Sequence, residues 1–391
     1  MKCTMDIKKM KKLAEQLASR VLCFSKGGQV ILLKGEVGSG KTTFSRFFSE
    51  YLQIESNSPT FSILETGSVF NEKINKTINI IHADFYRASQ ERSAELLDEY
   101  LENYQVSSRE NNNSNSDDIN IYLLEWIDEE LKQEFFYEQN IPVIEIEFTH
   151  DFSSAESKNN TTREFRDIEI IFKNAQSISV IEAKKLHNIY MTPLHVQDHI
   201  ELVRKIAVFC AKKIAENNSA IDIELVEAAA ILHDCVRYVD FPKLPTNSED
   251  AEQIKFYKPE ENITNEKCDF WAKIKEEYRT VHHAFAMQDI LDKMNFEATG
   301  QVVKSHFTGD ICRKSEFSLE ELCVYYADKR AMHNKFVTVQ ERLIDGAKRY
   351  PSTQSRHTND LLLTKILDFE KKLQELGGWA EDEIQNTFRR S

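Results

Sequence analysis

Several features that would place this 391-residue chain in a membrane or outside the cell are missing from its sequence. No apolar run approaches the roughly eighteen residues that a membrane span needs. The N-terminal stretch MKCTMDIKKMKKLAEQL is charged and amphipathic, and it has no apolar core like that of a signal peptide. The seven cysteines are scattered and include no Cys-x-x-Cys pair, which is typical of reduced thiols. The sequence therefore predicts a soluble, cytoplasmic protein with no membrane segment.

Basic residues are also fewer than acidic residues. The chain has 50 Lys and Arg against 64 Asp and Glu, which gives a formal net charge of -14. Wide contact with a nucleic-acid backbone needs basic side chains that displace counterions, so this composition disfavours it without excluding a local basic patch. The length predicts two or three domains, and the hydrophobic fraction of 41% is enough for well-buried cores.

The first half of the chain alternates between helical and strand patterns. Apolar residues at helical spacing occupy 6–22, and a second helix is expected at about 41–52. The expected strands are 29–35, 78–84, 120–126, 142–148 and 166–172. Strands separated by helical stretches predict an α/β sheet, in a domain of residues 1–175. The polar low-complexity segments 107–118 and 153–162 are expected to be a mobile surface insertion and the connection of a hairpin between the last two strands.

The pattern changes after about residue 178. Apolar residues then recur at three- and four-residue spacing, and strand signals are almost absent. The second half is therefore predicted to be a separate all-helical domain over residues 180–391, joined to the first near 173–185.

The segment GEVGSGKT, residues 35–42, fits the phosphate-binding pattern G-x-x-x-x-G-K-[ST] between an expected strand and an expected helix. Glycines let backbone N–H groups surround phosphate oxygens, and the helix N-terminus adds a favourable dipole. Lys41 can bridge terminal phosphates, and the hydroxyl of Thr42 can bind Mg²⁺. The expected nucleotide-binding residues are Gly35, Glu36, Gly38, Ser39, Gly40, Lys41, Thr42 and Thr43.

A phosphate-binding loop also needs a carboxylate to hold or orient Mg²⁺. Asp84 ends the strand INIIHAD, and Glu125 stands near the end of NIYLLEW, where ligands of open α/β sheets gather. By pattern alone, Asp84 is equally suited to capping the next helix, and Glu125 to being an ordinary exposed acid.

Four blocks in this order resemble the signature of the TsaE (YjeE) family: GEVGSGKTTF, SPTFSILE (58–65), HADFYR (82–87) and LLEW (123–126). These small P-loop ATPases are required by bacteria to make threonylcarbamoyladenosine next to the anticodon of tRNA. The resemblance covers roughly residues 5–173 and implies ATP with Mg²⁺. It also implies turnover within a complex of the threonylcarbamoyltransferase and its partner subunit, and the acidic composition suggests that tRNA is contacted through these partners.

The resemblance assigns roles residue by residue. It implies that Lys41, Thr42 and Thr43 hold phosphates and metal, that Glu125 is a Mg²⁺ ligand and that Asp84 orients or activates water. Ser58, Pro59 and Thr60 would form a switch-like loop near the γ-phosphate, with Thr60 as the catalytic residue of that loop.

The residues beside these blocks are less clear. Tyr86 and Arg87 either shape the site or pack, and Trp126 is expected in the core rather than near the base. The family commonly has proline after this tryptophan, where the present chain has Ile127. This departure touches none of the assigned residues and bears on partner contacts only.

In the second half, nine of the 11 histidines follow residue 186. The helical run AAAILHDCVRYVD, residues 228–240, contains the pair His233-Asp234, which by itself is an ordinary helix end. His199 begins another helical pattern, and Asp328 interrupts the apolar VYYADKRAM, where an acid is costly to bury unless it is paired or metal-bound. Imidazole and carboxylate together suit Mn²⁺, Fe²⁺ or Mg²⁺.

The order His…His-Asp…Asp resembles the HD superfamily of metal-dependent phosphohydrolases, an all-helical fold, over roughly residues 186–345. The resemblance implies metal-assisted phosphoester hydrolysis, with Asp234 also bridging to a second ion. By position, the first metal would be held by His199, His233, Asp234 and Asp328.

Some positions in this second site stay open. His306 and either His282 or His283 stand where some superfamily members bind a second ion, and the spacing to later apolar residues favours His282. His195 competes with His199, whose helical continuation is better. Arg237 is equally suited to neutralising a phosphate and to pairing with an acid.

The sequence therefore predicts an ATPase of tRNA modification joined to a metal-dependent phosphohydrolase that acts on a nucleotide or another phosphoester. The alternative is a nucleotide-binding scaffold whose helical half is a non-catalytic interaction module.

Overall fold

The chain divides into two compact units. A computed structural model describes the following residues: 2–24, 28–54, 64–72, 74–110, 118–150, 166–173, 176–217, 220–252, 261–311, 314, 316–349 and 356–389. The first unit comprises Met1–Ala175, Asn218–Ala220 and Ser315–Ser318, and the second comprises Gln176–Asn217, Ile221–Lys314 and Leu319–Ser391. The main division, after Ala175, falls inside the junction expected at 173–185.

The first unit is built on a seven-stranded sheet in the order β1-β7-β6-β2-β5-β4-β3. Its strands are β1 (Lys2–Met5), β2 (Gly28–Gly35), β3 (Leu64–Asn71), β4 (Lys76–Asp84), β5 (Ile119–Glu125), β6 (Val143–His150) and β7 (Arg166–Lys173). The four central strands β6, β2, β5 and β4 are parallel, and the outer strands pair antiparallel. The predicted α/β sheet is confirmed, as a mixed sheet.

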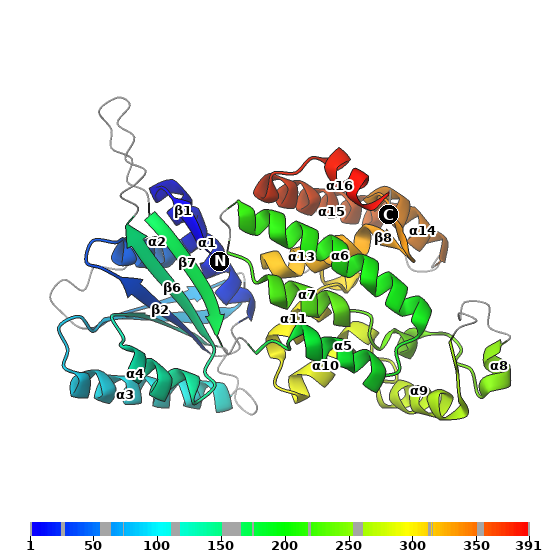
Figure 1. The fold of residues 1–391 in the computed structure, drawn as a ribbon, viewed down its shortest axis with the longest axis horizontal. Coiled ribbons are helices and arrows are strands. Elements are labelled where there is room, and N and C mark those ends of the chain that lie inside the picture. Colours follow the sequence, from blue (N-terminus) through cyan, green and yellow to red (C-terminus); the bar gives the residue numbers. More distant parts are fainter. Residues whose placement is uncertain are drawn as a thin grey trace. The chain divides into compact units, whose positions relative to one another are not determined.

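Alternate residues of the buried strand β2 serve the two faces of the sheet. Ile31 and Leu33 pack into one core with α1 (Ile7–Phe24) and α2 (Lys41–Tyr51). Val30 and Leu32 pack into the other with α3 (Gln90–Glu110), α4 (Glu129–Lys132) and the π-helical turn Gln133–Tyr137. Figure 1 shows these helices on opposite sides of the sheet. Because helices cover both faces of the sheet, a ligand is expected to bind at the carboxyl ends of the parallel strands.

Some local predictions for the first unit were wrong. The strands β1 and β3 were missed because one is very short and the other is an edge strand with no fully buried residue. The strand expected at 120–126 ends at Glu125, since Trp126 has φ 65 and leaves the sheet. Residues 107–110 of the expected surface loop belong to α3. The loop with Ser58, Pro59 and Thr60 and the segment 153–162 lie outside the described residues.

The second unit is helical, as predicted, apart from the short pair β8 (Ala331–Met332) and β9 (Lys335–Phe336). Its longer helices are α5 (Val180–Ile189), α6 (Leu194–Glu216), α7 (Ile223–Leu232), α9 (Asn265–Glu277), α10 (His283–Lys293), α11 (Glu297–Lys304), α13 (Leu319–Lys329), α14 (Val339–Arg349), α15 (Arg356–Gly377) and α16 (Glu381–Phe388). Shorter elements are η2 (Arg237–Asp240), α8 (Ser248–Glu252) and α12 (Thr308–Ile311). Among the described residues, no helix has the length and apolar character needed to cross a membrane.

Three helices form the centre of this unit, since α6, α7 and α13 pack against one another. All residues of α13 are buried, and α7 is buried from Leu225 through Leu232 except for Glu227. Helices that are covered on every side must satisfy or pair each polar group they carry. Asp328 of α13 and His233 at the end of α7 are therefore among the residues to explain.

Candidate nucleotide site and candidate metal centre

The loop between β2 and α2 has backbone conformations that only glycine adopts easily. Gly35 has φ 143, and a Cβ there would lie 2.4 Å from the carbonyl oxygen of Phe148. Gly40 has φ 111, and a Cβ there would lie 3.0 Å from Nε of Arg166. That Nε donates a hydrogen bond to the carbonyl oxygen of Ser39 at 2.9 Å, which braces the loop from β7. Nothing in the motif pattern pointed to Arg166.

Lys41 is held inside this loop by the loop itself. Its Nζ donates hydrogen bonds to the carbonyl oxygens of Gly35 at 2.7 Å and Glu36 at 3.0 Å. Burial lowers the pKa of Lys41, although Glu125 and Asp84 act in the opposite direction. The ammonium group thus bonds to backbone carbonyl oxygens. Phosphate oxygens can take their place, and the side chain of Lys41 then stays paired.

The two predicted carboxylates lie together at the carboxyl edge of the sheet, where Asp84 and Glu125 are register partners on β4 and β5. Glu125 is buried, and its Oε1 accepts hydrogen bonds from Thr42 Oγ1 at 3.4 Å and faces His82 Nε2 at 2.9 Å. Asp84 also accepts a hydrogen bond from the N–H of Tyr86 at 3.0 Å, so it caps a turn as well. Hydroxyl and carboxylate oxygens are suitable Mg²⁺ ligands.

His82 was not assigned a role from the sequence. The strand period of two places it on the same face of β4 as Asp84, and this signal could have found it.

Trp126 lies at the edge of the core in which it was predicted, packed against the cluster that contains Tyr122 and Leu124. It is half-buried, its ring centroid lies 4.2 Å from Nζ of Lys41, and Tyr86 packs against it at 4.8 Å. It also lines a cavity of about 710 Å³ together with Gly35 and Glu36. We call residues 35–43 with Asp84, Glu125 and Trp126 the candidate nucleotide site. Arg87 is exposed.

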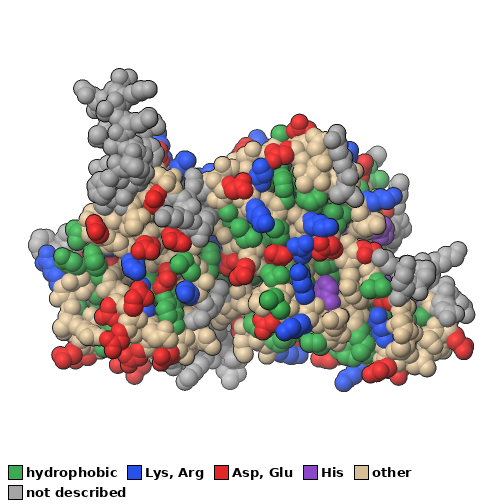
Figure 2. Space-filling view, in the orientation of Figure 1, with side chains coloured by type: hydrophobic (Ala, Val, Ile, Leu, Met, Phe, Trp, Pro, Cys, Tyr) green, Lys and Arg blue, Asp and Glu red, His purple; other side chains and the backbone are tan. Residues whose placement is uncertain are grey.

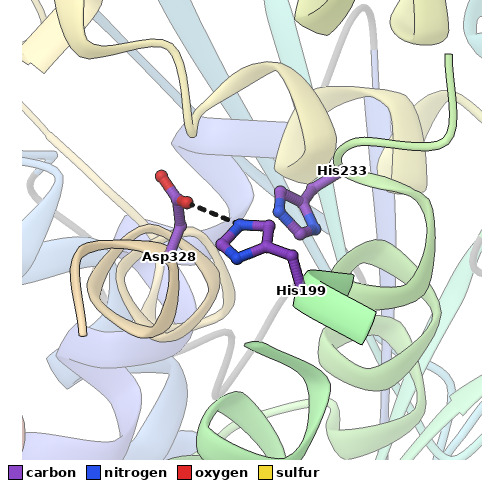
Figure 3. Close-up of side chains that lie close together, drawn as sticks. All are labelled: His199, His233 and Asp328. Atoms are coloured by element: carbon purple, nitrogen blue, oxygen red, sulfur yellow. Dashed lines mark hydrogen bonds and ion pairs between the residues drawn. The ribbon is translucent and has the colours of Figure 1, made fainter. Parts of the chain in front are cut away.

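The second unit brings His199, His233 and Asp328 together from α6, the end of α7 and α13. Figure 3 shows the three side chains converging, and Nε2 of His199 lies 3.2 Å from Oδ1 of Asp328. One potential ligand atom of each lies within 4.8 Å of the others. Residues 129 positions apart thus form one group, as the pattern predicted.

A second group adjoins the first and corrects one prediction. Nε2 of His283 lies 2.8 Å from Nε2 of His306 and 2.8 Å from Oδ1 of Asp234. His282, the residue favoured from the sequence, instead caps α10 by accepting the N–H of Ala284 at 3.2 Å, and its Nε2 lies 3.5 Å from Asp240. His282 precedes α10 with an extended backbone, whereas His283 is its first residue, so the two side chains leave the chain in different directions.

Asp234 connects the two groups through its two oxygens. Oδ2 lies 3.8 Å from Nε2 of His199 and 3.8 Å from Nε2 of His233. Oδ1 lies 2.8 Å from Nε2 of His283 and 3.6 Å from Nε2 of His306. The arrangement is that of a carboxylate between two pairs of imidazoles. We call His199, His233, Asp234, His283, His306 and Asp328 the candidate metal centre.

Hydrogen bonds determine the tautomers of three of the four imidazoles. In three rings Nδ1 faces a carbonyl oxygen, which can only accept: His333 O for His199, Ala230 O for His233 and Val303 O for His306. In these rings Nδ1 therefore carries the proton, and Nε2 presents a lone pair to the centre. Nδ1 of His283 lies beside both Oδ2 of Asp240 and, at 2.7 Å, NH1 of Arg237. Nε2 of His233 is buried with no hydrogen-bond partner. Facing lone pairs need a cation between them, so the residues fit a metal.

The charge states agree with metal binding. Burial lowers the pKa of His233 and holds that of His306 well below its usual range, which keeps both rings neutral. Burial would raise the pKa of Asp234, but His233, Arg237 and His283 outweigh it and hold that pKa well below the usual range. Metal ligands must be neutral imidazoles and ionised carboxylates, and these three residues meet that condition.

Two residues that the sequence left open can now be placed. His195 lies one turn before His199 on α6, but its ring stacks on Phe241 with centroids 5.8 Å apart. Arg237 pairs with an acid, since its NH1 lies 3.6 Å from Asp240 Oδ2, and it also lines the cavity beside Asp234. Its role towards a phosphate stays a prediction.

Comparison with known proteins gives matches for the first unit. Residues 4–158 match the family described as threonylcarbamoyl adenosine biosynthesis protein TsaE. The chain is 34% identical over 123 residues to the TsaE protein of Bacillus subtilis and 34% identical over 92 residues to that of Aquifex aeolicus. These alignments cover 30% and 22% of this chain and 65% and 62% of the relatives, just under two thirds of their length. The resemblance to TsaE is thus confirmed for the N-terminal region.

A solved structure is also similar. The crystal structure of Bacillus subtilis YdiB is 23% identical, with a TM-score of 0.26, and the match covers 44% of this chain and 84% of that one.

Proposed function

We propose that the first unit binds ATP with Mg²⁺ and hydrolyses it as a component of the machinery that makes threonylcarbamoyladenosine in tRNA. The observation that carries this proposal is the placement of Thr42 against Glu125, 3.4 Å apart, at the end of a glycine loop that holds Lys41. Similarity of residues 4–158 to TsaE supports the pathway.

The residues of the candidate nucleotide site divide the work. Lys41 exchanges its carbonyl partners for phosphate oxygens, and Thr42 and Glu125 hold Mg²⁺. Asp84, register partner of Glu125, orients the attacking water. His82 fixes the carboxylate of Glu125 through the 2.9 Å contact. The similarity to TsaE further assigns Thr60, which lies outside the described residues, a catalytic role at the γ-phosphate.

The proposed partners are the subunits of the threonylcarbamoyltransferase complex, with tRNA contacted through them. Acidic side chains gather on the helices α3 and α4 of the first unit, where Figure 2 shows them on the surface. This face repels a phosphate backbone and favours a protein contact.

Two variants of the full chain test this proposal. Lys41→Ala should weaken ATP binding, whereas Glu125→Ala should keep binding and lose hydrolysis, with isothermal titration and phosphate release as readouts. Complementation of a strain lacking its own TsaE then reports on tRNA modification. If Glu125→Ala still supports modification, the unit is a nucleotide-dependent scaffold and turnover is not its function.

We further propose that the second unit is a metal-dependent phosphohydrolase of the HD type, acting on a nucleotide or another phosphoester. The single observation behind it is that four histidines surround the two oxygens of Asp234, with their Nε2 atoms between 2.8 and 3.8 Å from them. Mn²⁺, Fe²⁺ or Mg²⁺ suits this mixture of nitrogen and oxygen ligands.

Each side chain has a defined part in this chemistry. His199, His233 and Asp328 would hold one ion, His283 and His306 a second, and Asp234 would touch both. Bound ions would supply an activated water and stabilise the charge on phosphate oxygens. Asp240, which lies against Nδ1 of His283, would hold that ring in its orientation.

Metal analysis of the full chain and of Asp234→Ala, each with a screen of phosphoesters, tests this second proposal. Metal and hydrolysis should be lost together in the variant, while ATP turnover stays as in the wild type. A wild-type chain that binds no divalent ion and keeps its helicity on chelation would show that the second unit is an interaction module.

A further inference from the structure

A cavity of about 410 Å³ opens beside the candidate metal centre, and its charged lining is unbalanced. The acids that line it are Asp234 and Asp328, and both belong to the centre. Three cations, Arg237, Lys329 and Arg342, line the same cavity. Bound metal ions would add to this excess, so the cavity is suited to a ligand that carries several negative charges.

Arg342, on α14, is the cation whose surroundings are incomplete. Its side chain is only 20% exposed, yet its nearest acidic partners are Asp328 Oδ1 at 3.7 Å and Asp345 Oδ2 at 3.8 Å. Both distances exceed hydrogen-bond length. Its Nε is buried with no partner, and the guanidinium donates no hydrogen bond to any residue that the structure describes. A largely buried guanidinium group has five N–H donors, and leaving them without acceptors costs free energy unless an anion binds there.

Lys329 stands on the same side of the cavity. Its Nζ lies 2.6 Å from Oδ2 of Asp328, while Arg342 approaches Oδ1 of that carboxylate. The two cations therefore lie on either side of the carboxylate of Asp328, the residue of the centre that belongs to α13. Arg237 stands at the other half, with its NH1 2.7 Å from Nδ1 of His283. Positive charge thus borders the centre at both ends.

We propose that Arg342 and Lys329 form an anion subsite for the phosphoryl group next to the one attacked, so that the substrate carries at least two consecutive phosphoryl groups. This inference rests on the proposed phosphohydrolase function. A guanidinium group binds two oxygens of one phosphate at once. A substrate with a single phosphoryl group, held at the metals, would leave the guanidinium of Arg342 without such a partner.

The cleavage balances as a hydrolysis of a phosphoanhydride. The water oxygen forms a bond to the attacked phosphorus, and the bond from that phosphorus to the bridging oxygen breaks. The bridging oxygen leaves with the electron pair on the second phosphate, which takes one proton of the water. Arg342 and Lys329 neutralise the charge that develops on this leaving phosphate.

Equilibrium binding to the metal-loaded full chain tests the subsite without turnover. Lys41→Ala serves as the background throughout, so that the P-loop does not bind the probes. Methylenebisphosphonate and orthophosphate are titrated by calorimetry, with metal content verified afterwards. Arg342→Gln should weaken bisphosphonate binding about tenfold or more and orthophosphate binding by no more than about twofold. Arg279→Gln is the matched control, because Arg279 is 76% exposed and does not line the cavity.

The outcomes separate this inference from the function beneath it. Metal-dependent hydrolysis of p-nitrophenyl phosphate with unchanged bisphosphonate preference in Arg342→Gln would overturn the subsite and leave the phosphohydrolase standing. Lost preference in a chain that hydrolyses no phosphoester would support the subsite and reject the enzyme. If circular dichroism shows that Arg342→Gln is unfolded, Lys329→Gln takes its place with the same expected loss of preference.

Discussion

The two sites of this chain are put together in opposite ways. The candidate nucleotide site is built around one continuous loop, residues 35–43, completed at the ends of neighbouring parallel strands. The candidate metal centre takes its residues from positions 199 to 328, which come from separate helices and turns of the second unit. Local chain geometry shapes the loop of the first site and the sheet adds its carboxylates, whereas the second site exists only when the helices pack.

They also differ in how their polar atoms are satisfied. Lys41 is bonded to carbonyl groups of its own loop, although Ser39 Oγ and His82 Nδ1 nearby are buried with no hydrogen-bond partner among the described residues. At the candidate metal centre and its cavity, Nε2 of His233 and Nε of Arg342 are in the same situation. The difference lies in the groups that bind the ligand: the ammonium of Lys41 is already bonded, whereas the facing imidazoles of the second site gain stability from a bound ion.

Chelation should therefore produce the largest contrast between the units. Removing divalent metal from the full chain is expected to lower the melting temperature of the second unit by about 10 °C, because binding energy at such sites is also folding energy. The first unit, without nucleotide, should be unaffected. Hydrogen exchange followed by mass spectrometry during heating resolves the two; equal protection of the second unit with and without metal would contradict the contrast.

Exchanging the two adjacent histidines sharpens the description of the centre. His283→Gln should release one of two bound ions, since it removes the Nε2 that faces both His306 and Asp234. His282→Gln is the matched control and should keep both ions, because that ring caps α10. Metal stoichiometry by mass spectrometry decides, and the reverse result would return His282 to the centre.

A smaller effect is expected from Asp240→Asn. Asp240 lies against Nδ1 of His283 and is not itself one of the six residues of the centre. Loss of such an orienting carboxylate costs about 10–100-fold in metal affinity. Competition with a fluorescent chelator measures this, and an unchanged affinity for both ions would show that the bond to Asp240 has no orienting role.

The smallest effect concerns the nucleotide site. Trp126→Leu removes the ring that lies 4.2 Å from Nζ of Lys41 and should destabilise the first unit by about 1 kcal/mol. Trp126→Phe keeps an aromatic face and should recover part of the loss. Urea unfolding of both variants tests this. Identical values for Leu and Phe would mean that the ring contributes by burial alone.

How far the sequence predicted each site follows from these differences. The loop from Gly35 to Thr43 could be identified because the phosphate-binding pattern is contiguous and its flanking strand and helix have clear periodicity. His82 was missed although it alternates with Asp84 on β4, and the strand before Trp126 was predicted one residue too long because the positive φ of Trp126 is not visible in the letters. Arg166 on β7 contacts Ser39 of the loop, 127 positions earlier in the chain. No local sequence pattern predicts a contact over such a separation.

The sequence by itself determined an α/β unit with a phosphate-binding loop followed by a helical unit, because periodicity and short motifs act through neighbouring residues. It also determined that histidines accumulate in the second half. Only the tertiary structure decided that His283 rather than His282 faces Asp234, that Asp240 lies against His283, and that Nε of Arg342 has no hydrogen-bond partner among the described residues. Those facts depend on which side of a helix faces its neighbours, and the packing of the whole unit sets that rotation.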